Sequence, residues 1–536
     1  KVAKSALNPW VIVIILAIPV FQNSLDLTVV SAFLPELIVE LKIPLQTGLD
    51  DAAWIVSGYL LASIISLAIM GRVSDLAGRR MVYIVSMMIY IIGSYLVAVA
   101  HTYPTDMLYS LYRRSGQMID PAYVNLQVII IARIIQAFGA GAITPVSMAL
   151  VSDLFPANRR ALVLGFIGAM DTLGWVLGHL YGGLFLQLPG VRWQTMFWLN
   201  IPITFIALAV TLWALRGIPM KRSTGTFDIF GAIFIVGALI CLSIGLGGIN
   251  LNTSTSIQSL AESQIVPFNW GLIGTSALLL LIFILIESRV KSPLINLHLF
   301  RRRNVNMGLI ANLLIGYCIF IGLVSVPILI NIRLNSIADM QDAALLVGIL
   351  LGAMTVPMAL ATLPGGWLTQ KIGYRRTISL GMVITIIGFL WMWRTWSLDI
   401  SNIIITMQMI LIGTGIGLTF SPISAGVVNS ADEDEHGVAS SLVLIMRLIG
   451  MTVSTTSLTS FALNRVNYLA SAQLVGVPLN SDVYLQTYAT IAAGVLSELG
   501  LIGAVIAGLA ILPALAMRDD AINLTPKSPL HFGEGT

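Results

Sequence analysis

A short basic segment after the second apolar block of the chain reads Gly71-Arg72-Val73-Ser74-Asp75-Leu76-Ala77-Gly78-Arg79-Arg80. A related segment lies 295 positions further along and reads Gly366-Trp367-Leu368-Thr369-Gln370-Lys371-Ile372-Gly373-Tyr374-Arg375. Both begin with glycine, carry an apolar residue two positions later and a second glycine seven positions later, and end in arginine. This internal repetition predicts a fold made of two related halves.

The rest of the chain is strongly apolar. It has 536 residues, of which 57% are apolar and 10% are charged, and its mean hydropathy is +0.91. Soluble domains carry roughly 25% charged residues, so a soluble globule is excluded. The apolar residues come in blocks of about 20, the length of helix that crosses ~30 Å of hydrocarbon. We therefore expect an all-α polytopic membrane protein, embedded in the lipid bilayer.

Fourteen apolar blocks are long enough to be transmembrane helices. They cover residues 10–38, 51–70, 80–100, 124–150, 160–187, 195–216, 228–249, 269–288, 304–332, 342–369, 376–395, 401–428, 437–463 and 488–516. An even number of spans places both termini on one side of the membrane. Most of the 29 Lys and Arg residues lie between blocks on that side, which predicts cytoplasmic termini and a cytoplasmic (inner) membrane location. Charges scattered in this way do not form a nucleic-acid-binding patch.

The repeat and the spans together predict the domain organisation. An offset of 295 is too long for two adjoining six-span halves, and an extra pair of spans supplies the difference. The expected parts are an N-terminal six-helix bundle at 1–222, a linker hairpin of two transmembrane helices at 223–292, a C-terminal six-helix bundle at 293–517 and a cytoplasmic tail at 518–536. Cys241 and Cys318 stand inside apolar blocks, without disulfide or metal-ligand spacing. We expect no cofactor and no metal site.

A series of motifs resembles those of the major facilitator superfamily, in particular its fourteen-span drug:proton antiporter family. The segment from Gly71 to Arg80 is similar to the signature loop of that superfamily. Further matching segments are Leu25-Asp26-Leu27-Thr28-Val29-Val30, Trp54–Tyr59, Arg133–Gly139, Phe197–Pro202, Phe227-Asp228, Pro293-Leu294 and Gly437–Ser441. The resemblance runs from about Leu25 to Gly450. It implies the major facilitator fold, in which two six-helix bundles rock about a central cavity.

The resemblance also implies a cytoplasmic gate. Asp75 would face the amino end of the span at 437–463, whose helix dipole favours an anion, and Arg79 would pair with Asp153. The alternative is that the basic loop merely anchors the chain at lipid headgroups. In the second copy Gln370 replaces the acid, so that contact should be weaker. The predicted gate comprises Gly71, Asp75, Gly78, Arg79, Arg80 and Asp153.

Ionisable residues within the spans are candidate functional residues, because burying a charge in hydrocarbon is costly. Asp26 shares a helical face with Gln22 and Asn23, which predicts a polar stripe that faces a cavity. The resemblance implies that Arg133 interacts with the proton-binding acid. Asp171 and Arg447 each lie about ten residues into a span, ~15 Å from the inner surface at the rise of a helix.

Asp171 and Arg447 are therefore a candidate pair between the two halves, although each could instead find a partner in its own half. The proton-coupling candidates are Asp26, Arg133, Asp171 and His179. The substrate-cavity candidates are Gln22, Asn23, Asn312, Gln408 and Arg447.

The span at 160–187 departs from the family's antiporter signature. Gly174 and Gly178 are kept, and small residues at this spacing allow helices to pack closely. His179 stands where the family has proline, which removes a kink-forming residue and adds a group that titrates near neutrality. Two interpretations stay open, a second proton site and a hydrogen-bonded interface residue.

The chain lacks the catalytic and phosphate-binding motifs of enzymes, so we expect a transporter and no enzyme. The leading hypothesis is proton-coupled export of small amphipathic or lipophilic compounds by alternating access. One alternative is export of a lipid or glycolipid, and another is a non-transporting subunit or scaffold of a larger membrane complex. The loop at 101–125 is rich in tyrosine and is the expected contact surface for an external or membrane partner.

Overall fold

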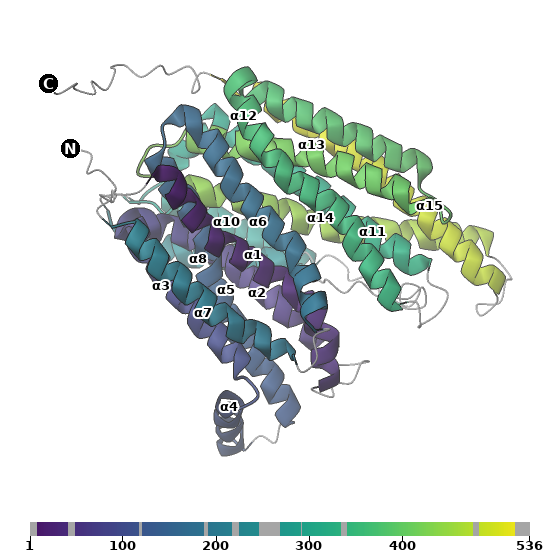
Figure 1. Ribbon diagram of the computed structural model, residues 1–536, viewed down its shortest axis with the longest axis horizontal. Coiled ribbons are helices and arrows are strands. Elements are labelled where there is room, and N and C mark those ends of the chain that lie inside the picture. Colours follow the sequence, from purple (N-terminus) through teal and green to yellow (C-terminus); the bar gives the residue numbers. More distant parts are fainter. Residues whose placement is uncertain are drawn as a thin grey trace.

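The computed structural model describes residues 8–40, 49–116, 120–186, 191–216, 225–245, 269–290, 292–333, 340–474 and 482–519. These residues form long helices that run side by side in two groups (Figure 1). The first group consists of α1 (Pro9–Glu40), α2 (Leu49–Ala77), α3 (Arg79–Ala98), α5 (Pro121–Leu154), α6 (Ala157–Leu186) and α7 (Trp193–Ala214). The second consists of α11 (Arg303–Ile332), α12 (Met340–Thr395), α13 (Asn402–Val428), α14 (His436–Gln473) and α15 (Asp482–Ala516). Between them come α8 (Ile229–Gly245), α10 (Trp270–Glu287) and a short 3-10 turn, η1 (Leu297–Arg301).

All fourteen predicted spans fall on helices. Within the described residues, eleven helices are long and apolar enough to cross a membrane. One of them, α12, covers two predicted spans. These two spans meet at Gly373, where the backbone leaves the helical conformation with a φ of 88°. The remaining two predicted spans coincide with α6 and the shorter α8. Gly78, between α2 and α3, has a φ of 96°, so both copies of the repeat turn at a glycine in the left-handed region that other residues rarely adopt.

Local chemistry determines where several helices begin. The Asp120 side chain accepts a hydrogen bond from the Ala122 amide, and Pro121 occupies the first helical position of α5. Asn269 caps α10 through the Leu272 amide, and Ser401 caps α13 through the Ile403 amide. These side chains satisfy amides that a helix start leaves without an intrahelical partner.

The two groups of helices meet at one end of the molecule, which we call the inner end. The helix α1 begins there (Figure 1), with Trp10 in edge-to-face contact with Phe155 at the end of α5. Among the described residues, every hydrogen bond between the two groups lies at this end. These bonds join Asp75, Arg79, Asp153, Ala157 and Arg160 of the first group to Asn429, Glu433, His436, Gly437 and Val438 of the second.

The helices α8 and α10 lie outside both groups. They pack on each other, and α8 also contacts α2. Large apolar side chains of both helices, such as Phe230 and Trp270, remain exposed, as expected of surfaces that face lipid. The boundaries of the linker hairpin and of the two bundles stay a prediction.

The loop predicted at 101–125 contains a short helix, α4 (Tyr103–Arg114), that has no buried residue. It lies beyond the bundle at the end opposite the inner end (Figure 1). Tyr112 donates a hydrogen bond to Gln127 on α5, while Tyr103, Met107 and Leu111 are exposed. Its role as a contact surface for a partner stays a prediction.

The close packing of α6 on α1 provides a test of the fold. A methyl group on Gly178 would overlap the Thr28 hydroxyl and the Leu25 carbonyl oxygen, so Gly178→Ala should destabilise the protein by about 1–3 kcal/mol. Gly168, on the same helix, has nothing within 4 Å of an added methyl group. Gly168→Ala should therefore leave stability unchanged or raise it slightly. Thermal unfolding of both variants in detergent checks this, and equal melting temperatures would contradict the packing.

Candidate functional site

A fully buried ion pair joins α1 to α5. Arg133 Nη1 lies 2.9 Å from Asp26 Oδ2, and both side chains are almost inaccessible to solvent. Asn200 on α7 donates a hydrogen bond of 2.9 Å to the other carboxylate oxygen, and Arg133 also donates to Gln136 Oε1 at 2.8 Å. An unpaired charge at such a site costs several kcal/mol. The three helices are therefore held in register by one carboxylate.

Two aromatic rings lie against Arg133, and one of them, Tyr59, stands between the ion pair and the central cavity. The guanidinium of Arg133 lies 4.0 Å from the centroid of the Tyr59 ring and 5.6 Å from that of Phe197. The Tyr59 hydroxyl donates a 3.1 Å hydrogen bond to Asn23 Oδ1. Tyr59 and Asn23 both line the central cavity, so a single side chain separates the ion pair from that cavity.

The central cavity lies between the two groups of helices. Its volume is about 100 Å³, below the ~300–1,000 Å³ typical of small-molecule sites. Most of the lining is apolar and comes from both groups, and it includes Leu27, Leu60, Leu67, Trp175, Ile319, Met358, Phe420, Leu444, Leu448 and Met451. A ligand in this cavity contacts both halves of the protein at once.

Asp171 and Arg447 both line the cavity but form no ion pair with each other. Asp171 finds partners in its own half, since its Oδ1 accepts hydrogen bonds from Ser24 at 2.6 Å and Thr144 at 3.5 Å. The guanidinium of Arg447 stacks 3.8 Å from the centroid of Phe420. Of the two arrangements that the sequence left open, the structure has the one without direct pairing.

Three of the predicted cavity residues lie elsewhere. Gln22 is buried towards α7, where it donates a hydrogen bond to Thr204. Asn312 donates to the Val443 carbonyl between α11 and α14. Gln408 accepts a hydrogen bond from Trp396 near the start of α13. These contacts cross-link neighbouring helices, as polar residues inside a span often do, and the role of the three residues in a substrate cavity stays a prediction. The side chain of His179 lies outside the described residues.

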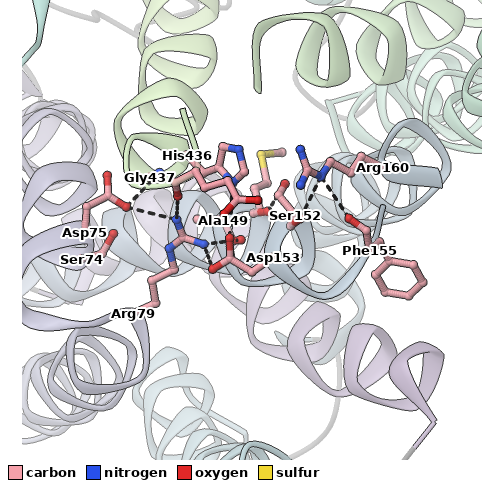
Figure 2. Close-up of polar contacts among 12 residues, drawn as sticks. Ser74, Asp75, Arg79, Ala149, Ser152, Asp153, Phe155, Arg160, His436 and Gly437 are labelled. Carbon is pink, nitrogen blue, oxygen red and sulfur yellow. Dashed lines mark hydrogen bonds and ion pairs between the residues drawn. The ribbon is translucent and has the colours of Figure 1, made fainter. Parts of the chain in front are cut away.

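At the inner end, Asp75 reaches the amino end of α14 (Figure 2). Its carboxylate accepts hydrogen bonds of 3.2 Å from the amides of Gly437 and Val438, and Arg79 Nη2 lies 3.3 Å from the same carboxylate. The helix dipole adds to these contacts, because the first amides of a helix carry partial positive charge. The contacts expected for Asp75 are therefore present, and its role as a gate stays a prediction.

Arg79 connects three elements at the same place (Figure 2). It pairs with Asp153, donates 2.8 Å to the Ala149 carbonyl and donates 3.1 Å to the Glu433 carbonyl of the other half. Asp153 also lies 3.3 Å from His436 Nδ1. Arg80 is half-buried and has no hydrogen bond from its side chain to the described residues.

Glycine permits the close approach of α2 to α14. A methyl group on Gly71 would overlap the Ser441 hydroxyl, and one on Gly437 would lie 2.6 Å from the Gly71 carbonyl oxygen. The second copy of the repeat has no acid at the position equivalent to Asp75, where Gln370 stands. Asp519, after α15, supplies the acid there and accepts a 2.6 Å hydrogen bond from the Tyr374 amide.

Sequence reasoning missed several residues of this site. Tyr59 and Asn200 both stand in segments that match the family, Trp54–Tyr59 and Phe197–Pro202, so the motifs held a usable signal. In the acidic run Asp432–Glu435, the residues Asp432, Glu433 and Asp434 are exposed. Glu435, in contrast, is buried and accepts a 2.7 Å hydrogen bond from Asn296. Burial raises the pKa of Glu435, although that bond lowers it.

Comparison with known proteins assigns the chain to one family. Residues 16–455 match the sequence profile of the Major Facilitator Superfamily. A triacylglyceride transporter of Mycobacteroides abscessus is 28% identical over 459 residues, which are 84% of this chain and 81% of the relative. The multidrug transporter protein MdtP of Bacillus subtilis is 28% identical over 465 residues, which are 86% of this chain and 76% of the relative.

Two solved structures share the fold. The proton:xylose symporter XylE has a TM-score of 0.55 at 13% identity and covers 93% of this chain and 94% of its own. The human organic anion transporter MFSD10 has a TM-score of 0.54 at 15% identity and covers 94% of this chain and 100% of its own. At these identities the likeness concerns the fold alone. Because the family profile matches most of the chain, the protein belongs to the Major Facilitator Superfamily and is a multi-pass membrane transporter.

Proposed function

We propose that this transporter exports amphipathic or lipophilic compounds in exchange for protons, from a cytoplasmic membrane in which both termini face the cytoplasm. The observation that carries the proposal is the buried pair of Asp26 and Arg133, one side chain away from a cavity built by both halves. Secondary transporters place their substrate and ion sites at such a midplane position.

Asp26 is the proposed proton site. Its protonation removes the negative charge that Arg133 faces, and the guanidinium then needs other acceptors in a buried place. The nearest groups are Gln136 and the Tyr59 ring. Because Tyr59 also lines the cavity, a movement of Arg133 changes the wall that the substrate touches. A proton on Asp26 is thereby coupled to the shape of the substrate site.

The inner end is the proposed cytoplasmic gate. In the present conformation it is closed by the contacts of Asp75 with α14 and of Arg79 with the Glu433 carbonyl. Opening towards the cytoplasm requires these contacts to break together, since all of them join one half to the other. Each is of modest strength, which suits a contact that forms and breaks in every cycle.

The substrate is proposed from the cavity and the relatives. Apolar side chains dominate the lining, which favours amphipathic or lipophilic molecules over sugars. One relative is named as a multidrug transporter, which supports efflux of varied small compounds. Others are named as triacylglyceride transporters, so export of a lipid by the same cavity is the second candidate. A scaffold without transport activity is disfavoured, because it would have no need of a buried ion pair.

The first prediction concerns Asp26→Asn, which removes the titration and keeps size and hydrogen bonding. In proteoliposomes with an imposed pH gradient, this variant should lose accumulation of an amphipathic dye and also the proton release that the substrate induces. The protein should still fold and bind the dye, because Asn200 can bond to the new amide.

Glu498→Gln is the matched control. Glu498 pairs with Arg465 in a half-exposed position, away from the cavity. Its neutralisation should therefore leave dye accumulation driven by the pH gradient unchanged. If Asp26→Asn accumulates dye with the same pH dependence as the unmodified protein, Asp26 is structural and the proposal fails.

The second prediction concerns Asp75→Asn at the gate. The interaction of a carboxylate with a helix amino end is worth about 1–2 kcal/mol when partly buried, so its loss should raise the open population roughly five- to thirtyfold. Ser441→Cys, in a protein whose Cys241 and Cys318 are replaced, reports opening, because Ser441 is buried against Gly71. Maleimide labelling of this cysteine should accelerate in the Asp75→Asn background. An Asp106→Asn control on α4 should not change the rate, and an unchanged rate with Asp75→Asn would show that the loop is only an anchor.

A further inference from the structure

The central cavity presents two opposite charges that do not meet. Asp171 comes from α6 in one half and Arg447 from α14 in the other, and both face the same space. No ion pair joins them among the described residues, although each retains unused capacity for hydrogen bonds. Buried charges are normally paired. A ligand in the cavity that carries groups of both charges would pair with both side chains.

Of the two side chains, Arg447 is the one whose hydrogen-bonding groups are more clearly unused. Its side chain is 92% buried, its Nε is inaccessible and has no acceptor, and its guanidinium forms no hydrogen bond within the described part of the chain. Phe420 covers one face of the guanidinium at 3.8 Å, which fixes its plane. The Arg447 backbone is also held, because a methyl group on Gly316 of α11 would overlap its carbonyl oxygen. A buried guanidinium that forms no hydrogen bond is a receptor for a carboxylate or phosphate group.

Asp171 offers the opposite chemistry. Both of its hydrogen bonds, from Ser24 and Thr144, go to Oδ1. Oδ2 is left for a donor in the cavity. A purely anionic ligand at Arg447 would be repelled by Asp171, and a purely cationic ligand at Asp171 would be repelled by Arg447. A ligand with both charges satisfies both side chains and leaves the cavity neutral.

We infer that this cavity binds a zwitterionic amphiphile, with its acidic group on Arg447, its ammonium group on Asp171 and its hydrocarbon chain along the apolar wall. That wall includes Leu444, one turn before Arg447 on α14, and Leu448 and Met451, which follow Arg447 on the same helix. The inference rests on the proposed function for the route of transport, but the binding it describes is independent of protons. The ligand connects the two halves because its two charges lie on helices of opposite halves.

The test uses the full chain in lipid nanodiscs and four short-chain probes below their micellar concentrations. The probes are a lysophosphatidylethanolamine, the matching lysophosphatidic acid, an alkylamine and a monoacylglycerol. The unmodified protein should bind the zwitterion most tightly. Arg447→Gln should weaken zwitterion binding by at least about tenfold, as expected for a lost charged hydrogen bond, and should shift the preference to the alkylamine. Asp171→Asn should instead shift it to the lysophosphatidic acid.

Two further variants separate recognition of charge from a structural role. Arg447→Lys keeps the charge, so it should keep the preference for the zwitterion, whereas a merely structural arginine would lose it. Glu498→Gln should have no effect on binding of any probe. Free phosphoethanolamine should bind much more weakly than the amphiphile. Equal binding would show that the hydrocarbon chain of the amphiphile does not contribute to recognition.

Similar affinities for all four probes, or the same shift in both charge variants, would overturn the inference. The outcome for the proposed function is read separately, from transport driven by a pH gradient. Charge-selective binding without such transport would contradict proton-coupled export and leave this inference standing. Proton-driven export that does not change when Asp171 or Arg447 is neutralised would support proton-coupled export and contradict this inference.

Discussion

The constraint that organises this protein is that a charge inside the membrane needs a partner within hydrogen-bond distance. Asp26 and Arg133 meet this constraint at 2.9 Å, and Asn200 completes the coordination of the carboxylate. Through these contacts α1, α5 and α7 are positioned relative to one another, and Tyr59 of α2 is added by its stacking on Arg133. A single proton can remove the charge on which this cluster depends. The cluster is therefore a structural centre, and it is the site that we propose for proton coupling.

The inner end follows a different principle. It uses helix amides and backbone carbonyls in place of a full ion pair between the halves, with Asp75 on the first amides of α14 and Arg79 on the Glu433 carbonyl. Contacts of this modest strength fit the proposed role of the inner end as a gate. Glycines allow the helices to come close enough for them to form, which explains why Gly71 and Gly437 face each other.

Much of this arrangement could be predicted from the sequence. Hydropathy placed all fourteen spans on helices, because apolar blocks of membrane length leave few alternatives. The repeat paired Gly78 with Gly373, and both have a positive φ in the structure. Motif resemblance foresaw the contacts of Asp75 and Arg79, since these depend on short segments that keep their order.

The composition of the cavity was harder to predict. Whether a polar residue inside a span faces a cavity or a neighbouring helix depends on the rotation of that helix, which packing decides. Gln22, Asn312 and Gln408 bond to neighbouring segments, whereas Asn23, Asp171 and Arg447 line the cavity. The burial of Glu435 depends on its contact with Asn296, which lies far away in the sequence. No local pattern reports such contacts.

The central claim is that the charge on Asp26 stabilises the conformation in which the inner end is closed. Double electron–electron resonance between spin labels at Arg159 and Arg376, which are exposed in opposite halves, measures this closure in nanodiscs. Because protonation removes the pair that this conformation contains, the distance distribution should move to longer values as the pH falls. With Asp26→Asn the longer distances should dominate at every pH. A distribution that stays the same at all pH values in the unmodified protein would contradict the account.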